Sequence, residues 1–294
     1  NAGYASFCEL LNAFAIGRTL PRVVEDAQRC AAYLESIGDR PLLLATHAHL
    51  RACELLSAAR PGGSGLTLVD ATPEQLNPAS RFVVHGLRAI VCWMLEDRAG
   101  LRAAIEDGNP ALSAGTGMFT RVVFDVIAAA DACSDYAEAD ARAQALLETK
   151  ARQTLAMLKR WNASCPQNAS PLLHLFAGEW AMARGQLELA RDEYSAAADA
   201  AIASGMLNFE GLANERGAKV LLALGQPRYA VGYLEHARRS YARWGAHALE
   251  RRVLERLRSL GHTHHAPKPE RGTATPVTEV HAIDLTSIVK HSLA

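Results

Sequence analysis

The sequence lacks the features that mark a membrane protein or a strongly charged protein. Its longest strongly apolar runs, FAIG, PLLLA and VCWML, are far shorter than the roughly 20 residues that span a bilayer. Lys plus Arg equals Asp plus Glu at 31 each, so the charge balance gives no global reason to expect nucleic acid or an anionic membrane as partner. The remaining composition is that of an ordinary globular chain.

Nothing in the sequence resembles a disulfide framework. The six cysteines are widely spread, never form a C-x-x-C pair, and mostly lie within apolar helical patterns, where free cysteine behaves as a small hydrophobe. We interpret them as reduced and buried, which predicts a cytoplasmic location. They are Cys8, Cys30, Cys53, Cys92, Cys133 and Cys165. The start at Asn1, without a visible signal peptide, indicates an excerpt from a longer protein or a processed one.

The sequence also has no run of alternating β-branched residues that would predict a sheet. The nearest candidate, LTLVDA at 66–71, follows the flexible RPGGSG at 60–65 and is better interpreted as a loop or short extended piece. Ala, Leu, Arg and Glu dominate elsewhere, and these residues lose little side-chain entropy in a helix. The composition therefore predicts an all-α fold.

A repeat supplies the architecture. In segment 170–205, Gly178 and Gly185 are seven residues apart, and Ala190, Tyr194 and Ala197 follow at intervals of five, four and three. This spacing is typical of a tetratricopeptide repeat: a small residue lets two helices approach, a glycine makes the turn, and an aromatic residue fills the contact.

A shift of forty residues reproduces the pattern in segment 207–246. Gly185 becomes Gly225, Ala190 becomes Ala230, and Tyr194 becomes Leu234. In the same way, Ala197 becomes Ala237 and small Gly178 becomes small Ala218. Large residues would fill the remaining space, namely Trp180, Tyr194, Tyr229, Tyr233 and Trp244. We therefore expect a tetratricopeptide-like α-solenoid of antiparallel helix pairs.

Fainter copies lie upstream. One turn is expected at Gly17 to Pro21 and another near Glu96 and Asp97, followed by apolar Leu101 and Ile105. Degenerate helical pairs are expected at 42–59 and 119–161, and breaks at 60–65, 107–117 and 164–171.

The expected domain covers residues 1–261, with the clearest repeats at 170–205 and 207–246. Apolar periodicity then disappears, which predicts a flexible linker at 262–282. Segment 283–294, IDLTSIVKHSLA, resumes as the start of a helix that leads to a further, missing domain.

Catalytic motifs are missing as well. The phosphate-binding G-x-x-x-x-G-K-[ST] loop, the kinase motifs and G-x-S-x-G are all absent. GTGMFT at 115–120 lacks the third glycine and the preceding strand of a dinucleotide-binding turn. We assign no catalytic, cofactor-binding or metal-binding residue to the chain, and we do not expect an enzyme.

Histidines and carboxylates give only weak metal-binding patterns. His47 and His49 are two residues apart on a presumed helix and so point to different faces. The cluster His262, His264 and His265 falls in the expected linker, which offers no fixed geometry. Asp131 and Asp135 are one helical turn apart and can hold a metal, but we interpret them as part of a solvated helix face.

The last repeat helices carry an excess of arginine, which would suit an acidic partner. No aromatic residues are interleaved in the manner of a nucleic-acid-binding surface, so a solvated basic face is the simpler interpretation. The arginines are Arg238, Arg239, Arg243, Arg251, Arg252, Arg256 and Arg258, against Glu250 and Glu255.

The stretch from EGLANERGAKVLLALG to YARWGAHALERRVLERL resembles the end of the helical repeat region in large bacterial hybrid signalling proteins. The matching residues are Leu212, Ala213, Asn214, Glu215, Tyr233, Leu234, Ala237, Tyr241, Arg243, Trp244, Gly245 and Ala246. IDLTSIVKHSLA is similar to the segment that leads into the next domain of that family, and YASFCELLNAFAIGRTL resembles its earlier repeats. His247 and Ala248 depart from the usual Lys-Ala.

This resemblance implies a parent protein with a serine/threonine-kinase-like domain, an AAA-type ATPase, helical repeats, a GAF sensor domain and a histidine kinase. ATP and Mg would belong to those other domains, and none of their catalytic residues lies in this chain. The expected function is binding of a protein partner, or coupling between flanking domains. An alternative is the small-effector-sensing helical domain of an ATPase-type transcription activator, and a helical enzyme around Asp131 and Asp135 is the third hypothesis.

Overall fold

The computed structural model describes residues 2–58 and 66–262, and within these ranges it is entirely helical, without a strand. The expectation of an all-α chain is confirmed, and 66–71 form a loop as expected. The helices are α1 Ala2–Ala15, α2 Leu20–Ile37, α3 Arg40–Ser57, η1 Pro73–Gln75, α4 Pro78–Leu95, α5 Arg98–Gly108, η2 Asn109–Gly115, α6 Phe119–Cys133, η3 Tyr136–Glu138, α7 Ala141–Ser164, α8 Pro166–Ala183, α9 Leu187–Ser204, α10 Leu207–Ala223, α11 Pro227–Trp244 and α12 His247–Ser259. Among these helices, none combines the length and apolarity that crossing a bilayer requires.

The C-terminal region, defined here as α8–α12, has a turn every twenty residues. Gly185, Gly205, Gly225 and Gly245 all have positive φ, between 69° and 88°, and each follows the end of a helix. Glycine adopts this left-handed conformation without the steric cost of a Cβ atom. Two successive helix pairs, α8 with α9 and α10 with α11, therefore repeat at the expected forty residues.

The small residues allow close helix crossings, as the sequence predicts. A Cβ atom added at Gly178 would lie 2.7 Å from the Tyr194 ring, and one at Gly211 would lie 2.4 Å from the Tyr241 ring. Glycine is therefore needed where an aromatic ring of the partner helix lies against the backbone. The expectation that Tyr229 fills the helix contact is wrong: its side chain is 69% exposed, whereas the adjacent Ala230 faces the contact and is buried.

Several expected boundaries differ from the structure. Segment 164–171 is not a loop, because α7 and α8 are separated only by Cys165 and Pro166 occupies the first turn of α8, where a missing N–H costs little. Segment 107–117 is largely the 3-10 helix η2, and 40–57 is one helix instead of a pair. The turns at Gly17 and at Glu96 are confirmed. Segment 60–65 and all of the expected linker and final helix beyond His262 lie outside the described residues.

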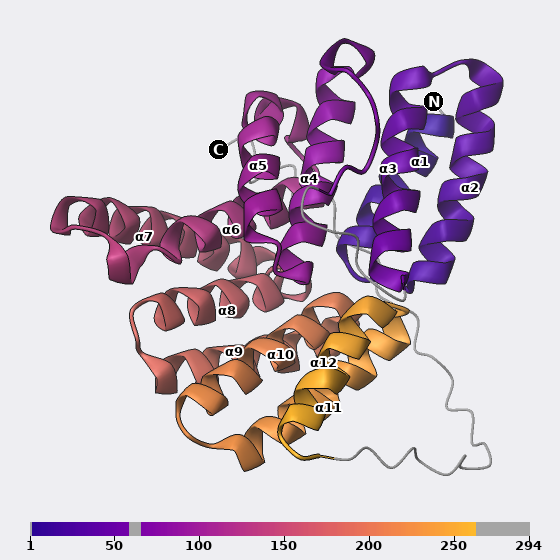
Figure 1. Ribbon diagram of the computed structural model, residues 1–294. Helices are drawn as coiled ribbons and strands as arrows, with labels where there is room; N and C mark the ends of the chain where they lie inside the picture. The colour runs from indigo at the N-terminus through magenta and orange to yellow at the C-terminus, as the bar shows by residue number, and fades with distance from the viewer. Residues whose placement is uncertain (1, 59–65, 263–294) are drawn as a thin grey trace, which may run out of the picture.

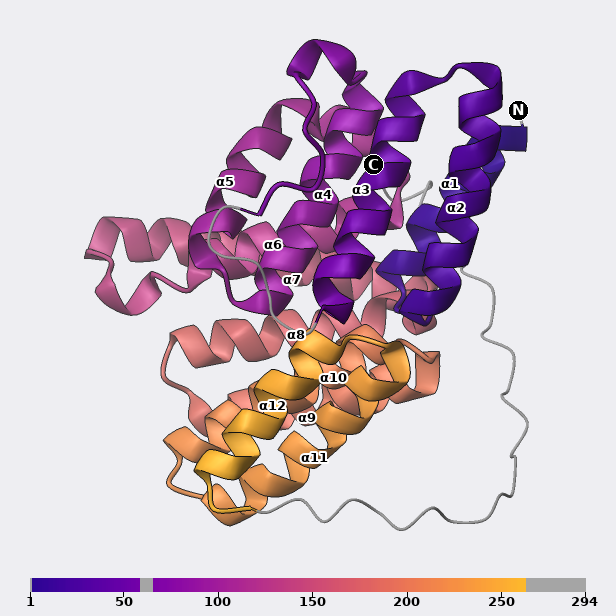
Figure 2. The same ribbon diagram turned by 45° about the vertical axis from the view of Figure 1, so that its right-hand side comes forward.

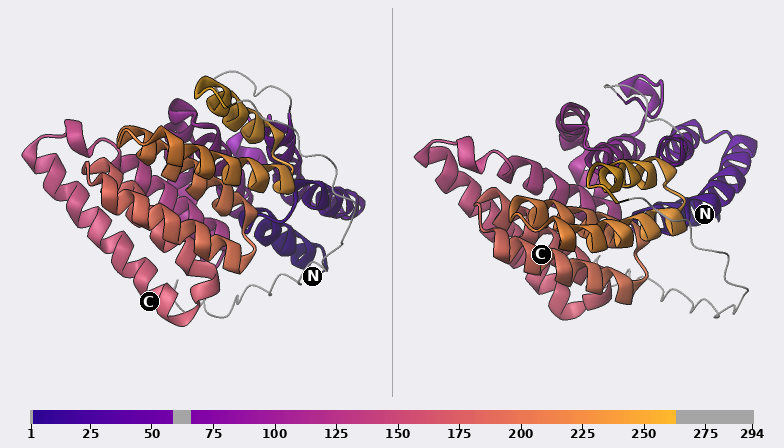
Figure 3. Two further views of the ribbon diagram at one scale, coloured as in Figure 1. Left: turned by 90° about the horizontal axis from the view of Figure 1, so that it is seen from below. Right: turned by 60° about the horizontal axis from the view of Figure 1, so that its bottom comes forward.

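The N-terminal region, defined here as α1–α6, packs against the C-terminal region. In Figure 1 helices α1–α4 stand above α8–α12, which run across beneath them, and α7 extends to one side (Figures 1 and 2). Seen from below, the helices of the C-terminal region lie next to one another in chain order (Figure 3). Contacts between α6 and α8 and between α12 and α3 join the regions.

Two hydrogen bonds, one buried and one partly buried, also cross this junction near the first turn of the chain. Asn208 Nδ2 donates to the Ala15 carbonyl oxygen at 2.9 Å, and Trp244 Nε1 donates to the Arg18 carbonyl oxygen at 3.0 Å. The last repeat therefore holds the first turn, although more than 190 residues separate each pair in sequence.

Candidate functional site

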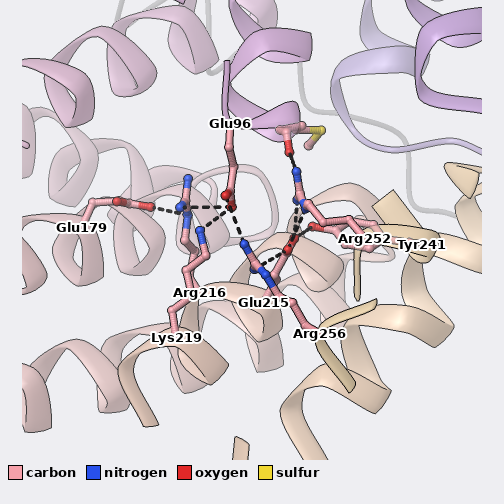
Figure 4. A network of polar contacts seen from close by, with 9 residues as sticks. Glu96, Glu179, Glu215, Arg216, Lys219, Tyr241, Arg252 and Arg256 are labelled. Atoms are coloured by element: carbon pink, nitrogen blue, oxygen red, sulfur yellow. Dashed lines mark hydrogen bonds and ion pairs between the residues drawn. The ribbon is translucent and has the colours of Figure 1, made fainter. Parts of the chain in front are cut away.

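A buried glutamate lies at the centre of a polar network between the two regions (Figure 4). Glu215 of α10 is 1% exposed. Its carboxylate accepts a hydrogen bond from Tyr241 Oη at 2.9 Å and a two-armed contact from Arg252, at 2.9 and 2.6 Å. Arg256 Nη1 adds a further bond at 2.7 Å. Two arginines and a phenol thus satisfy a carboxylate whose burial alone would be costly.

These contacts correct the expectation of a solvated basic face for Arg251, Arg252 and Arg256, whereas Arg239, Arg243 and Arg258 are exposed as expected. Arg252 also donates to the Met94 carbonyl oxygen at 2.7 Å, and Arg251 donates to the Ala58 carbonyl oxygen at 2.8 Å. The arginines on one side of α12 therefore point into the molecule. The physical reason is that acceptors from distant helices converge there, which helical periodicity within one segment does not reveal.

Glu96 connects this network to the α4–α5 turn. Glu96 directly follows α4 and has a φ of 62°. Among the residues that the structure describes, it is the only non-glycine residue with a positive φ. The left-handed conformation costs a residue with a Cβ atom on the order of 1–2 kcal/mol, whereas Gly38, Gly205 and Gly245 occupy the same helix-end position elsewhere. A glutamate at a position suited to glycine indicates that its side chain has a role.

The Glu96 carboxylate bridges α10 and α12. One oxygen contacts the Lys219 ammonium and lies 3.7 Å from Arg216 Nη1, while the other accepts from Arg256 Nη2 at 3.1 Å. Burial by itself would raise the pKa of Glu96, but the charges of Lys219 and Arg252 outweigh burial and hold the pKa at about 2. The carboxylate is therefore ionised at neutral pH.

A third carboxylate, Glu179 of α8, extends the network. Its Oε1 atom lies 3.0 Å from Arg216 Nε. Lys219 is one helical turn from Arg216 on α10, and its pKa is lowered by burial and by the Arg216 charge, against the opposing effect of Glu96. Side chains from α8, α10, α12 and the α4–α5 turn thus alternate in charge across the junction.

A cavity of about 250 Å3 opens beside this network. Helices α4, α5, α6, α8 and α10 all contribute to its wall. The lining residues are Cys92, Trp93, Glu96, Arg98, Leu101, Ala130, Asp131, Ser134, Glu179, Arg216 and Lys219. Burial and the nearby Asp97 carboxylate raise the pKa of the Cys92 thiol to about 12, so it is not a reactive thiolate at neutral pH.

Asp131 lines the cavity, and it shares two arginine partners with Asp135. Arg102 Nε donates to Asp131 at 3.2 Å, and Asp135 contacts both Arg98 and Arg102. Asp131 is largely buried, with an 11% exposed side chain. The expectation of a solvated carboxylate is therefore wrong for Asp131, whereas Asp135 has a 43% exposed side chain. Two arginines of α5 neutralise both groups.

The histidines are dispersed. His47 is exposed and His49 is buried on the opposite face of α3, as their spacing predicts. His49 Nδ1 bonds the Ala45 carbonyl oxygen at 2.9 Å between the rings of Phe7 and Phe14, and burial lowers its pKa to about 4. His262 Nε2 lies 3.7 Å from Glu235 Oε1, whereas His264 and His265 lie outside the described residues.

Sequence reasoning assigned no role to Glu215 or Glu96, although both carried a signal. Glu215 occurs among Leu212, Ala213 and Ala218, on a helix whose apolar residues are nearly all buried. Glu96 stands where a glycine would end the helix, directly before the N-cap residue Asp97. A charged residue on an apolar face, or at a left-handed position, points to a buried partner.

The polar network and the cavity overlap where the two regions meet, and both include Glu96, Glu179, Arg216 and Lys219. Within the described ranges, no group of histidines, cysteines and carboxylates forms a metal-binding cluster. No family model, curated protein or solved structure matches the chain.

Proposed function

We propose that this chain is a non-catalytic helical-repeat module that binds a protein partner or couples flanking domains. The parent would be a cytoplasmic, multidomain bacterial signalling protein with an AAA-type ATPase and a sensor histidine kinase. The module would be a tetratricopeptide-like solenoid, supported by the forty-residue repeat of α8–α11 and its glycine turns. ATP and Mg would act in the other domains of that parent.

The observation that carries the coupling role is the attachment of α12. Its Arg252 and Arg256 bind Glu215 of α10, and Arg256 also binds Glu96 beside α4. A displacement of this last described helix would break contacts with both regions together. Because ion pairs of this kind have discrete geometries, the network suits an element with two alternative positions.

The coupling role is tested in the natural full-length protein with Arg256→Gln. Arg258→Gln is the matched control, since Arg258 lies on the same helix and is exposed. We expect Arg256→Gln to change ATP turnover or autophosphorylation several-fold while Arg258→Gln leaves both unchanged. Equal behaviour of the two variants, or a full-length protein without ATPase and histidine-kinase motifs, would contradict the proposal.

A second candidate function is sensing of a small effector, as in an ATPase-type transcription activator. The cavity between the two regions is the observation that favours it. The two candidates differ in the domain expected after the repeats: the activator requires a DNA-binding domain, whereas the coupling module precedes a sensor domain and a kinase. The coding sequence downstream of residue 294 distinguishes them.

A further inference from the structure

The cavity at the junction has the size of a small-metabolite site. Its volume of about 250 Å3 lies just below the roughly 300–1,000 Å3 typical of sites for drug-sized ligands. Its wall is part apolar, through Trp93, Leu101 and Ala130, and part charged. Sites at the meeting point of several elements commonly bind small molecules in this way, with an apolar wall and a few fixed polar groups.

The charged part of the wall is electrically balanced. It contains three carboxylates, Glu96, Asp131 and Glu179, and three cations, Arg98, Arg216 and Lys219. An anion or a cation alone would leave an uncompensated charge in a partly buried site, which costs free energy. A ligand that carries one charge of each sign adds no net charge and finds partners of both signs.

Glu179 and Arg216 form a wall pair whose hydrogen bonding is incomplete. Glu179 Oε1 and Arg216 Nε are buried and lie 3.0 Å apart as an ion pair, but their alignment falls short of a hydrogen bond. A polar ligand group that bonds either atom would complete its hydrogen bonding.

We infer that the cavity binds a small zwitterion of the α-amino acid class with an apolar side chain. The ligand carboxylate faces Arg216 and Lys219, its ammonium group faces Glu179, and its side chain packs on Trp93 and Leu101. This binding site does not depend on the coupling role; it rests on the second candidate function, effector sensing, and names the class of its ligand. Glu96 belongs to both the wall and the Arg256 contact, so an occupied cavity acts directly on the attachment of α12.

Isothermal titration of the full chain with three matched probes tests the ligand class. L-Leucine carries both charges, 4-methylpentanoate lacks the ammonium group, and isopentylamine lacks the carboxylate. We expect L-leucine to bind at least tenfold more tightly than either analogue, because each analogue brings an uncompensated charge into a balanced wall and lacks one of the two polar contacts. Equal binding of all three probes, preference for either analogue, or no heat with L-leucine, L-valine or L-methionine at 10 mM overturns the inference.

A blocked cavity provides the second measurement. Ser134 lines the cavity, is exposed, donates to the carbonyl oxygen three residues before it and accepts from Arg98 Nη2 at 2.8 Å. Ser134→Trp therefore fills the opening and also removes this one contact with Arg98. Ser36→Trp is the matched control, because Ser36 is also exposed and makes the same local bond. We expect Ser134→Trp to weaken L-leucine binding at least tenfold and Ser36→Trp to leave it unchanged. Unchanged binding in Ser134→Trp places the ligand elsewhere and overturns the inference.

Circular dichroism verifies that both variants remain folded. These titrations use the chain alone, whereas the coupling role is tested by activity of the full-length protein. Failure of one proposal is thereby distinguishable from failure of the other.

Discussion

The two regions of the molecule reach the same all-helical structure by different means. In the C-terminal region the turns are made by glycines at a fixed spacing of twenty residues, and α8–α12 have no side-chain N-caps. In α3, α4 and α5 of the N-terminal region, Asp39, Asn77 and Asp97 each accept a hydrogen bond from the first turn of the helix that they precede. Side-chain caps thus mark three helix starts of the N-terminal region, although α2 and α6 in that region have none.

The comparison also locates the candidate site. The C-terminal region supplies Glu215, Arg216 and Lys219 from helix α10. The N-terminal region supplies Glu96 from a turn where a glutamate, not a glycine, has a positive φ. The charged network therefore forms where a repeated geometry meets a unique one. Four predictions test whether the stability of one region is separable from that of the other.

The largest effect is expected from Glu215→Ala. It leaves Arg252 and Arg256 without their shared carboxylate, and removal of one partner of a buried pair costs about 3–5 kcal/mol. Because both arginines are partly exposed, the lower end of this range is expected in urea unfolding. Glu255→Ala is the control, since Glu255 is an exposed glutamate of α12. Similar urea unfolding midpoints for the two variants would show that the network does not stabilise the packing of the two regions.

The second-largest effect is expected in the acid sensitivity of the N-terminal region, through His49. Unfolded His49 binds a proton below its ordinary pKa of 6.5, whereas burial keeps the folded residue neutral until about pH 4. The unfolded state thus binds more protons in this window, and stability is full above pH 6.5 and falls by about 1.4 kcal/mol per pH unit toward pH 4. His49→Leu should flatten this slope, while exposed His47→Gln should keep it. Urea midpoints measured from pH 7 to 4 provide the check.

A pair of glycine substitutions probes the packing of the C-terminal region. Gly211→Ala would place a Cβ atom 2.4 Å from the Tyr241 ring and should cost about 1–3 kcal/mol through overpacking. Gly232→Ala lies on helix α11 with open space around it, and it should stabilise the protein by up to about 1 kcal/mol. Opposite shifts in thermal midpoint are expected, and two shifts of the same sign would disprove the close crossing.

The smallest net effect is expected from Glu96→Gly. The substitution relieves the left-handed strain of about 1 kcal/mol or more, but it removes the contacts with Lys219 and Arg256. We expect a change in stability within about 1 kcal/mol, together with faster amide hydrogen exchange confined to α12. Unchanged exchange in α12 would show that Glu96 does not secure that helix.

Much of the fold can be predicted from local sequence, and less of the site can. The turns at Gly17, Glu96, Gly185 and Gly225 are visible because glycine, or a break in apolar periodicity, marks them. The loop expected at 164–171 is wrong, because proline near a helix start has the same composition as proline in a loop. Asp131, Arg251, Arg252 and Arg256 were expected to be solvated, because nothing local to them encodes their distant partners.

The sequence by itself determined the helical composition, the forty-residue spacing of helix pairs and the need for a small residue, Gly178, under Tyr194. These features depend on backbone sterics and on neighbours within about one repeat. Only the tertiary structure decided that Glu215 is buried, that Glu96 meets Arg256, and that a balanced cavity opens between the regions. The Glu96–Arg256 contact joins residues 160 positions apart, and the free energy of a buried charge depends on partners that the local pattern does not contain.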